Sequence, residues 1–410
     1  MKKLFFLMPF ALLAFASCSN DEVETKAVQK SADAVNFLPA MNNATRGTIY
    51  TDAGFSSDPG KFAVIASGSF KKGDKDDYAS STAITSYEGT VKYESGAWTF
   101  DNSSTDYLWW ADGTTTGKFT AYAPTDAGSV TSGSLSFSVK AAIADQKDLV
   151  VAYNEGSRSD FTSGVPLHFR HALSQIIVNA SYADEADETL YSKTTFPSLK
   201  VKIKAIKFNN LNGAGSLTLP TASTAAGESY TPVWAPTGST TSYTSSDNEV
   251  TLSSAPQNLL KSSDGAMLLL PQTQSPAASL ASTPSTGAYL EILADIDYAA
   301  AFKPSGATYE LIDLYPSAQT ALTANQTTGE GQYDWIAVPV TISWDGGYKY
   351  TYTLNFSNIA CGKVSPNQTS TLAADKAKGD DVISGVPYPV NFLVTVEDTW
   401  QDGGTTTPTL

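Results

Sequence analysis

Two residues near the start of the sequence lie where the chain itself could be modified. Cys18 ends a short stretch that opens with Lys2 and Lys3, continues as an apolar run over residues 4–16 and closes on small residues. A basic start, a short hydrophobic run and small residues before a cleavage point are the features of a secretory signal. The Cys18 thiol could carry a lipid through a thioether. The second residue, Arg46, is an isolated cation among small and polar residues.

The residues around Cys18 favour a lipid over a disulfide. "FASC" resembles the lipobox of bacterial lipoproteins, with Phe15 in place of the usual Leu, Val or Ile, and the polar and acidic residues 19–22 resemble the surface-export signal of Bacteroidetes lipoproteins. We therefore expect residues 1–17 to be a lipoprotein signal peptide and Cys18 to be lipidated; the alternative is an ordinary cleaved signal peptide. An acylated Cys18 leaves Cys361 as a small buried hydrophobe rather than half of a disulfide.

The remaining chemistry-bearing residues do not form a recognisable active site. His168 and His171 lie three apart in "LHFRHAL", a spacing that puts them on opposite faces of a strand. Asp74, Asp76 and Asp77 lack the spacing of a calcium loop and predict a solvated turn. The sequence contains neither a G-x-S-x-G elbow nor a glycine-rich phosphate loop. We therefore predict no catalytic, cofactor or metal site, and a protein that is not an enzyme.

Charge and length limit the class of protein further. The 410 residues carry 26 basic and 41 acidic side chains, for a formal net charge of -15. A surface of this sign repels nucleic-acid phosphates, so we expect no nucleic-acid partner. The length is enough for two sizeable domains, and 41% hydrophobic residues can supply packed cores.

The elements that must carry these residues are short strands joined by polar turns, which predicts an all-β chain. "VKYESGAWTF" predicts a hairpin around Ser95 and Gly96, and "WADGTTTGKF" predicts a turn between two aromatic strands. Near the end, alternation places four apolar residues on one strand face: Val390, Phe392, Val394 and Val396. "YLWW", residues 107–110, fits either a sandwich core or an exposed platform on which sugars stack.

Several motifs occur in a characteristic order: "FASCSNDE", "ATRG", "FTAYAP", "DQKDLVVA", "VPLHFRHALSQIIV", "LLLPQT" and "VNFLVTVEDTW". Together they resemble the fimbrillin (Mfa-like, FimA-like) family of Bacteroidales, the subunits of type V pili. The resemblance implies two tandem transthyretin-like Greek-key β-sandwich domains after the signal peptide. With a boundary near residue 160, the domains would span residues 47–160 and 161–410.

The resemblance also implies how the subunit would mature. A lipid on Cys18 would hold the precursor at the outer membrane, and residues 18–46 would form a tether and a removable strand. The tether covers 46 − 18 = 28 positions, which reaches ~90 Å at ~3.3 Å per residue. An arginine-specific surface protease would cut between Arg46 and Gly47. Other fimbrial subunits would then add a β-strand to the exposed edge, and the mature protein would be located in the cell-surface fimbrium.

Two questions stay open at the level of sequence. Residues 401–410 are short, polar and glycine-rich, unlike an apolar donor strand, so the donor is either residues 389–400 or absent, as in a tip or accessory subunit. The alternative function is a surface-tethered glycan-binding lipoprotein of a polysaccharide-uptake system, which would need Trp109 or Trp110 exposed. A host or bacterial surface receptor is a further expected partner of an adhesive subunit.

Overall fold

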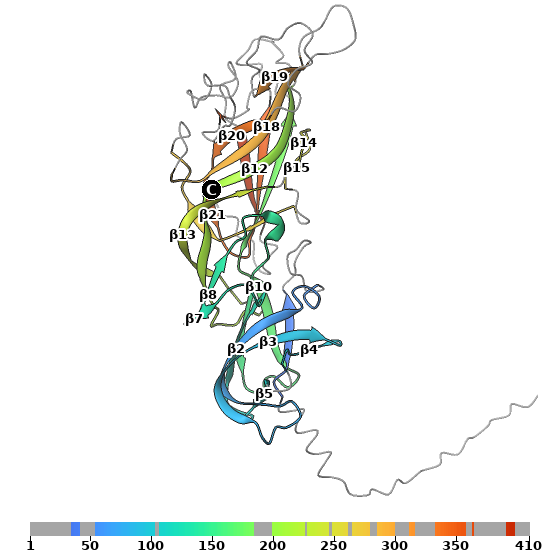
Figure 1. The fold of residues 1–410 in the computed structure, drawn as a ribbon, viewed down its shortest axis with the longest axis vertical. Helices are drawn as coiled ribbons and strands as arrows, with labels where there is room; N and C mark the ends of the chain where they lie inside the picture. The colour runs from blue at the N-terminus through green and yellow to red at the C-terminus, as the bar shows by residue number, and fades with distance from the viewer. Residues whose placement is uncertain are drawn as a thin grey trace, which may run out of the picture.

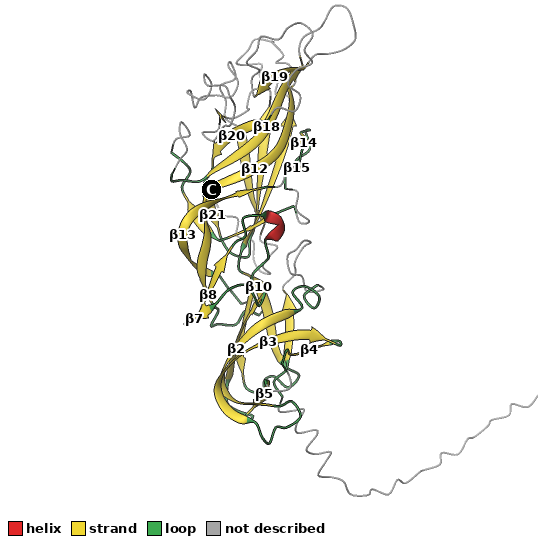
Figure 2. Ribbon diagram, viewed as in Figure 1, coloured by secondary structure: helices red, strands yellow, loops and turns green. Residues whose placement is uncertain are grey.

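The computed structural model describes residues 34–41, 54–102, 106–183, 199–225, 228–245, 248–260, 265–278, 285–299, 311–315, 333–357, 363–364 and 391–397. The described chain is elongated, with N-terminal strands at one end and C-terminal strands at the other (Figure 1). Strands dominate it, and the one helical segment among these residues is the 3-10 turn η1, Ile143–Asp145 (Figure 2). None of the described helices could cross a membrane. The prediction of an all-β chain is confirmed.

The N-terminal end is an eight-stranded sheet in the order β1-β10-β9-β6-β2-β3-β4, with β5 also paired to β2. Its strands are β1 (Phe37–Met41), β2 (Lys61–Gly73), β3 (Thr82–Glu94), β4 (Ala97–Phe100), β5 (Tyr107–Trp110), β6 (Gly117–Ala123), β9 (Val150–Gly156) and β10 (Val165–His171).

Period-two alternation explains how these strands fold. In β2, Phe62, Val64 and Ala66 are fully buried, while intermediate and exposed residues alternate with them. The predicted β3–β4 hairpin is confirmed, and its two turn residues have positive φ, 53° at Ser95 and 86° at Gly96. Two successive positive φ values are what a tight hairpin turn requires, and glycine adopts them without steric cost.

The C-terminal end contains two larger sheets and a small one. The five-stranded sheet contains β11 (Ser174–Ala183), β15 (Gln257–Asn258), β16 (Met267–Leu269), β22 (Lys349–Ser357) and β24 (Asn391–Glu397). The nine-stranded sheet contains β7 (Val130–Thr131), β8 (Ser134–Ser138), β12 (Leu199–Thr218), β13 (Val233–Thr244), β14 (Val250–Thr251), β18 (Tyr289–Ala299), β19 (Leu311–Tyr315), β20 (Asp334–Pro339) and β23 (Lys363–Val364). A two-stranded sheet joins β17 (Gln272–Gln274) to β21 (Ile342–Trp344).

The two larger sheets face each other across one hydrophobic core. Ile176 of β11 and Tyr352 of β22 come from the five-stranded sheet, and Ile203 of β12 and Leu290 of β18 come from the nine-stranded sheet. All four are at most 1% exposed. Two sheets that share a buried face in this way form a β-sandwich.

A separate hydrophobic cluster joins the two ends of the molecule. Tyr122 of β6 and Val151 of β9 pack in one cluster with Leu135 of β8 and Leu217 of β12. The β7–β8 hairpin, which precedes β9 in the chain, pairs with β12 of the nine-stranded sheet. The chain passes from the eight-stranded to the five-stranded sheet between His171, the last residue of β10, and the start of β11.

The turn between β5 and β6, which the sequence predicted, makes a testable electrostatic prediction. The Thr115 hydroxyl donates to Asp112 at 2.7 Å, and the backbone N–H groups of Thr115 and Thr114 donate to the same carboxylate at 2.6 and 2.9 Å. These hydrogen bonds lower the pKa of Asp112 from 3.8 to about 2, and the one from the Thr115 hydroxyl has the largest effect.

Because this folded-state pKa lies below the ordinary value, the contribution of Asp112 to stability is present above pH 3.8 and is lost as the pH falls through about 2. An NMR titration should place the Asp112 midpoint near 2. We expect Thr115→Val to raise that midpoint toward 3.8. A midpoint that does not move in this variant would show that the Thr115 hydroxyl has no part in the shift.

Candidate strand-acceptor site

The first strand of the structure lies at an edge of the eight-stranded sheet. β1 runs parallel to β10, with Phe37 opposite Val165 and Met41 opposite Phe169. The other described ladders of this sheet are antiparallel. A parallel pair cannot be joined by a tight hairpin, and here all six of the sheet's other strands lie between β1 and β10 in the chain. β1 is therefore connected to the sheet by side chains and one ladder, not by a turn.

The side chains of β1 and the residues before it alternate between core and solvent. Val35, Phe37 and Met41 are at most 5% exposed, whereas Leu38 is 47% exposed. The backbone is tied at the same end, because Val35 N–H donates to Leu108 O at 2.9 Å. Each large apolar side chain that is fully buried contributes about 1.5–3 kcal/mol of transfer free energy. This segment is thus an integral part of the N-terminal core.

Phe37 is the centre of that contribution. Its ring makes edge-to-face contacts with Phe62 of β2, Phe100 of β4 and Phe119 of β6, at centroid distances of 5.9, 5.7 and 5.9 Å. Aromatic pairs in this geometry add to the free energy of area burial. One side chain of β1 therefore touches three other strands, and without it their rings would lose a shared partner.

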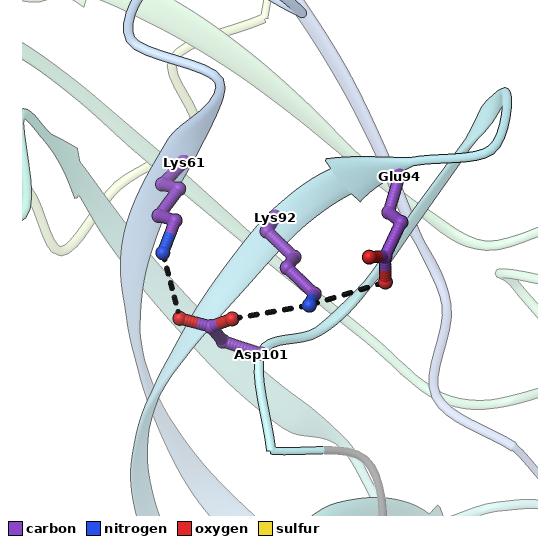
Figure 3. Close-up of polar contacts among 4 residues, drawn as sticks. All are labelled: Lys61, Lys92, Glu94 and Asp101. Atoms are coloured by element: carbon purple, nitrogen blue, oxygen red, sulfur yellow. Dashed lines mark hydrogen bonds and ion pairs between the residues drawn. The ribbon is translucent and has the colours of Figure 1, made fainter.

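The contact with Phe100 shows that β4, the far edge of the sheet, curls round to face β1. Around β4, Asp101 accepts from Lys61 of β2 at 2.9 Å and from Lys92 of β3 at 3.4 Å, and Lys92 also pairs with Glu94 at 3.1 Å (Figure 3). The hydrogen bond from Lys61, followed by that from Lys92, lowers the pKa of Asp101. Exposed ion pairs contribute little to the stability of a fold. The packing of Phe100 and the β3–β4 ladder therefore chiefly hold β4 beside β1.

The predicted cleavage and lipidation residues lie outside the described residues. Cys18 belongs to residues 1–33, and Arg46 and Gly47 belong to residues 42–53, between β1 and the turn that begins at Gly54. The described residue Phe55 resumes the fold immediately, because it is buried and its ring lies 4.8 Å from that of Phe169. The predicted cleavage point is thus flanked by two anchored segments of the same core.

The number of arginines limits where an arginine-specific protease can cut. The chain contains three, Arg46, Arg158 and Arg170. Arg170 is 2% exposed within β10. Arg158 lies in a short turn in which Ser157 donates from its backbone and its hydroxyl to Asp160, at 2.8 and 2.7 Å. Proteases need an extended and accessible chain, so neither arginine within the fold is a good substrate.

A sequence match that periodicity analysis missed links β1 to β24. Residues 35–38 and 390–393 are both "VNFL". In the first copy Val35 and Phe37 are the buried positions and Leu38 is the exposed one. Extending the alignment puts Val394 and Val396 at the places of Pro39 and Met41. A direct comparison of the two apolar strands would have found this match from the sequence.

β24 itself is an edge strand in the described part of the chain. It pairs antiparallel with β22, from Asn391 opposite Asn355 to Glu397 opposite Lys349. No described strand pairs with the other edge of β24. An edge strand can leave its sheet without breaking ladders on both sides.

The structure also decides the other predictions about candidate residues. Trp109 and Trp110 are 2% and 3% exposed, so the interpretation of "YLWW" as core is confirmed, and the exposed sugar platform is wrong. His168 and His171 lie on β10, as expected for a strand. The His171 ring lies 2.6 Å from the buried carboxylate of Asp148. The two tryptophans and His171 are thus buried parts of the fold.

The predicted solvated turn at residues 74–77 is confirmed, because Asp74 accepts the backbone N–H of Asp76 at 2.7 Å in an exposed turn. Among the described residues, no group of three or more His, Cys, Asp or Glu side chains could hold a metal ion.

Comparison with known proteins gives one family match. A family model described as fimbrillin-like matches residues 45–374. The curated proteins give no match. A fimbrilin from Porphyromonas gingivalis W83 is 11% identical, with 88% of this chain and 95% of that chain covered and a TM-score of 0.37.

Two proteins assigned to cell adhesion are also similar. One, from Bacteroides uniformis ATCC 8492, is 14% identical, with 90% and 97% of the two chains covered and a TM-score of 0.37. The other, from Parabacteroides distasonis ATCC 8503, is 9% identical, with 89% and 97% covered and a TM-score of 0.41. The family match spans well over half of the chain and is the stronger finding.

Proposed function

Because this chain belongs to the fimbrillin-like family, we propose that it is a non-enzymatic structural and adhesive subunit of a cell-surface fimbria, made as a lipid-anchored precursor. Cys18 would carry the lipid and hold the precursor at the outer membrane. The basic and apolar residues before Cys18 and the acidic residues after it support this step. Other fimbrial subunits and a receptor on a host or bacterial surface would be its partners.

Maturation would consist of one cut and the loss of one strand. Cleavage between Arg46 and Gly47 would sever β1 from the fold, because β1 has no other covalent connection to it. Loss of β1 would uncover the edge of β10 and the rings of Phe62, Phe100 and Phe119, which contact Phe37. An unpaired edge beside an apolar surface is a template for strand addition. The seating of β1 on β10 is the observation that carries this proposal.

The donor would be residues 390–396 of a neighbouring subunit. This segment repeats the "VNFL" of residues 35–38 and keeps apolar residues at the positions of Val35, Phe37 and Met41, which are buried. Seated in the register of β1, Phe392 would take the place of Phe37, and Val396 that of Met41. A chain with both an acceptor and a donor can polymerise head to tail, which favours a shaft subunit over a tip or accessory subunit.

We also propose that the chain forms two tandem transthyretin-like β-sandwich domains. The separate N-terminal and C-terminal cores support two units. The strand ladders favour a boundary near residue 172, between β10 and β11, rather than near residue 160. They also favour counting the β7–β8 hairpin with the second unit.

The donor assignment predicts that a free peptide can block assembly. The folded precursor would be cut by an arginine-specific protease in the presence of a peptide of residues 389–397. The ladder of oligomers on a gel should then stop at the monomer. A peptide that carries Phe392→Asp, which places a charge in the Phe37 position, should have no effect. Equal inhibition by both peptides, or by neither, would refute the assignment.

A further inference from the structure

The strand β10 is held in an unusual way on the side that faces away from β1. β9 and β10 pair at two positions, Val151 with Arg170 and Val150 with His171. Two residues further along, this antiparallel register would pair Tyr153 with His168. Among the described residues that pair is absent, and the ladder between β9 and β10 opens at this point.

The opening in the ladder is filled by one residue from the other end of the molecule. Thr224 belongs to the segment between β12 and β13 of the nine-stranded sheet, and it is fully buried. Its hydroxyl donates to His168 O at 2.5 Å and accepts from Tyr153 N–H at 3.1 Å. Its own N–H donates to Tyr153 O at 3.2 Å. Thr224 thus substitutes for a missing strand residue between β9 and β10.

The sequence of β10 explains why a single residue suffices. Val165 N–H points to β1, since it donates to Asn36 O at 2.8 Å. Backbone N–H and C=O groups point to alternate sides along a strand, so the backbone groups of Pro166 and His168 point toward β9. Proline has no N–H to donate to a ladder, and Pro166 O is bound by the Asn154 side chain at 2.7 Å. The His168 carbonyl is left for the Thr224 hydroxyl.

Arg170 fixes the segment that carries Thr224. Its Nε donates to Thr224 O at 2.8 Å, and one terminal nitrogen donates to Ala225 O at 2.6 Å and to Glu228 O at 3.1 Å. The guanidinium is buried in β10, so removing it would leave these carbonyl groups without a buried donor. Arg170 therefore fastens the β12–β13 segment to the acceptor strand.

Residues 165–169 of β10 have a different kind of partner on each edge. β1 is the ladder partner on one edge of this stretch. On the other edge, the Thr224 hydroxyl and the side chain of Asn154 in β9 take the place of the β9 backbone groups. We propose that Thr224 and Arg170 form a latch whose seating is coupled to the occupancy of the strand site. A strand beside β10 would stabilise the latch, and the latch would stabilise the strand, because coupling between two sites is reciprocal.

Only the role of the latch in a fibre depends on the proposed function. A subunit whose acceptor site is filled would have a firmly fastened junction between its eight-stranded and nine-stranded sheets, and a subunit with an empty site a looser one. Strand capture would therefore stiffen the subunit that accepts the strand. Thr224 and Arg170 act here as positioning residues, without contacting the incoming strand.

The test uses the uncleaved full chain and amide hydrogen exchange. Phe37→Ala loosens β1 and should speed exchange at the Thr224 amide about tenfold, the factor that corresponds to about 1.4 kcal/mol of local opening free energy. Leu38→Ala, on the exposed side of the same strand, is the matched control and should leave that rate unchanged. Faster exchange at Val165 in Phe37→Ala, with no change at Thr224, would overturn the latch.

The reciprocal arm starts from the latch. Thr224→Val keeps the shape of the side chain and removes its hydroxyl, and it should speed exchange at the Val165 amide about tenfold. Thr224→Ser keeps a hydroxyl and should therefore keep the slow exchange rate at Val165. If Thr224→Val acted only by misfolding the protein, the hydroxyl of Thr224→Ser would not be expected to prevent the effect. Thr221→Val, an exposed threonine in the same segment, is the control. Equal effects of Thr224→Val and Thr221→Val would also overturn the proposal.

Failure of the latch and failure of the proposed function are distinguishable in this design. The exchange experiment requires neither cleavage nor assembly. If β1 and Thr224 are coupled in a precursor that never polymerises, strand addition would be contradicted but the latch would still be supported. Normal polymerisation without coupling would contradict the latch alone.

Discussion

Arg46→Ala should leave the protein at its full lipidated mass, with no species that begins at Gly47 and no oligomer ladder. The wild-type chain, exposed to an arginine-specific protease under the same conditions, should give a mature form that starts at Gly47. The reason is geometric, because the other two arginines lie in a buried strand and in a hydrogen-bonded turn. The readout is the intact mass of the surface protein before and after protease.

Arg158→Ala is the matched control for that experiment, since it removes an arginine from the chain but not the one between β1 and Phe55. It should be processed and assembled like the wild type. A mature form that begins at Ser159, or normal processing of Arg46→Ala, would contradict the proposed cleavage site. A surface protein that keeps its lipid in every variant would favour a permanently anchored role.

Phe37→Ala should produce the largest loss of stability of any alanine substitution in β1. Replacing a buried phenylalanine by alanine costs about 3–5 kcal/mol in a well-packed core. Phe37 is 4% exposed and contacts three other rings. The measurement is the free energy of unfolding of the uncleaved precursor by denaturant. The loss cannot exceed the whole contribution of β1, because beyond that point the strand detaches.

Leu38→Ala provides the comparison, with the same kind of truncation one residue along the same strand. Leu38 is 47% exposed, and exposed substitutions usually change stability by at most about 0.5 kcal/mol. Equal losses for the two variants would mean that β1 is not seated in solution as the structure has it. A loss at Leu38 alone would mean that the strand is turned over by one residue.

The strands of this fold were predictable where alternation and turn chemistry agree. The Ser95–Gly96 hairpin and the turn around Asp112 both follow from local pattern. The partners of those strands were not predictable, because a strand's side-chain period does not encode which neighbour it binds. The parallel pairing of β1 with β10 is a long-range choice of this kind, because the other strands of the eight-stranded sheet lie between them in the chain.

The acceptor site was predictable in part. The resemblance to the fimbrillin family implied a removable strand within residues 18–46, and the structure shows three rings that Phe37 of β1 contacts. The Thr224 latch has no local signature, because an exposed loop threonine and a buried ladder threonine look alike in the sequence. The match between residues 35–38 and 390–393 was present in the sequence, but a search for long repeats passes over four residues.

The central claim is that residues 390–396 of one subunit replace β1 of the next, and a cysteine crosslink tests it most directly. In the precursor His168 lies opposite Ala40, so the pair A40C and H168C, with Cys361 replaced by serine, calibrates a short thiol crosslinker within one chain. In assembled mature protein, the pair H168C and T395C should crosslink between chains with comparable yield, because Thr395 aligns with Ala40. Crosslinking confined to single chains, or absent from assembled protein, would contradict the account.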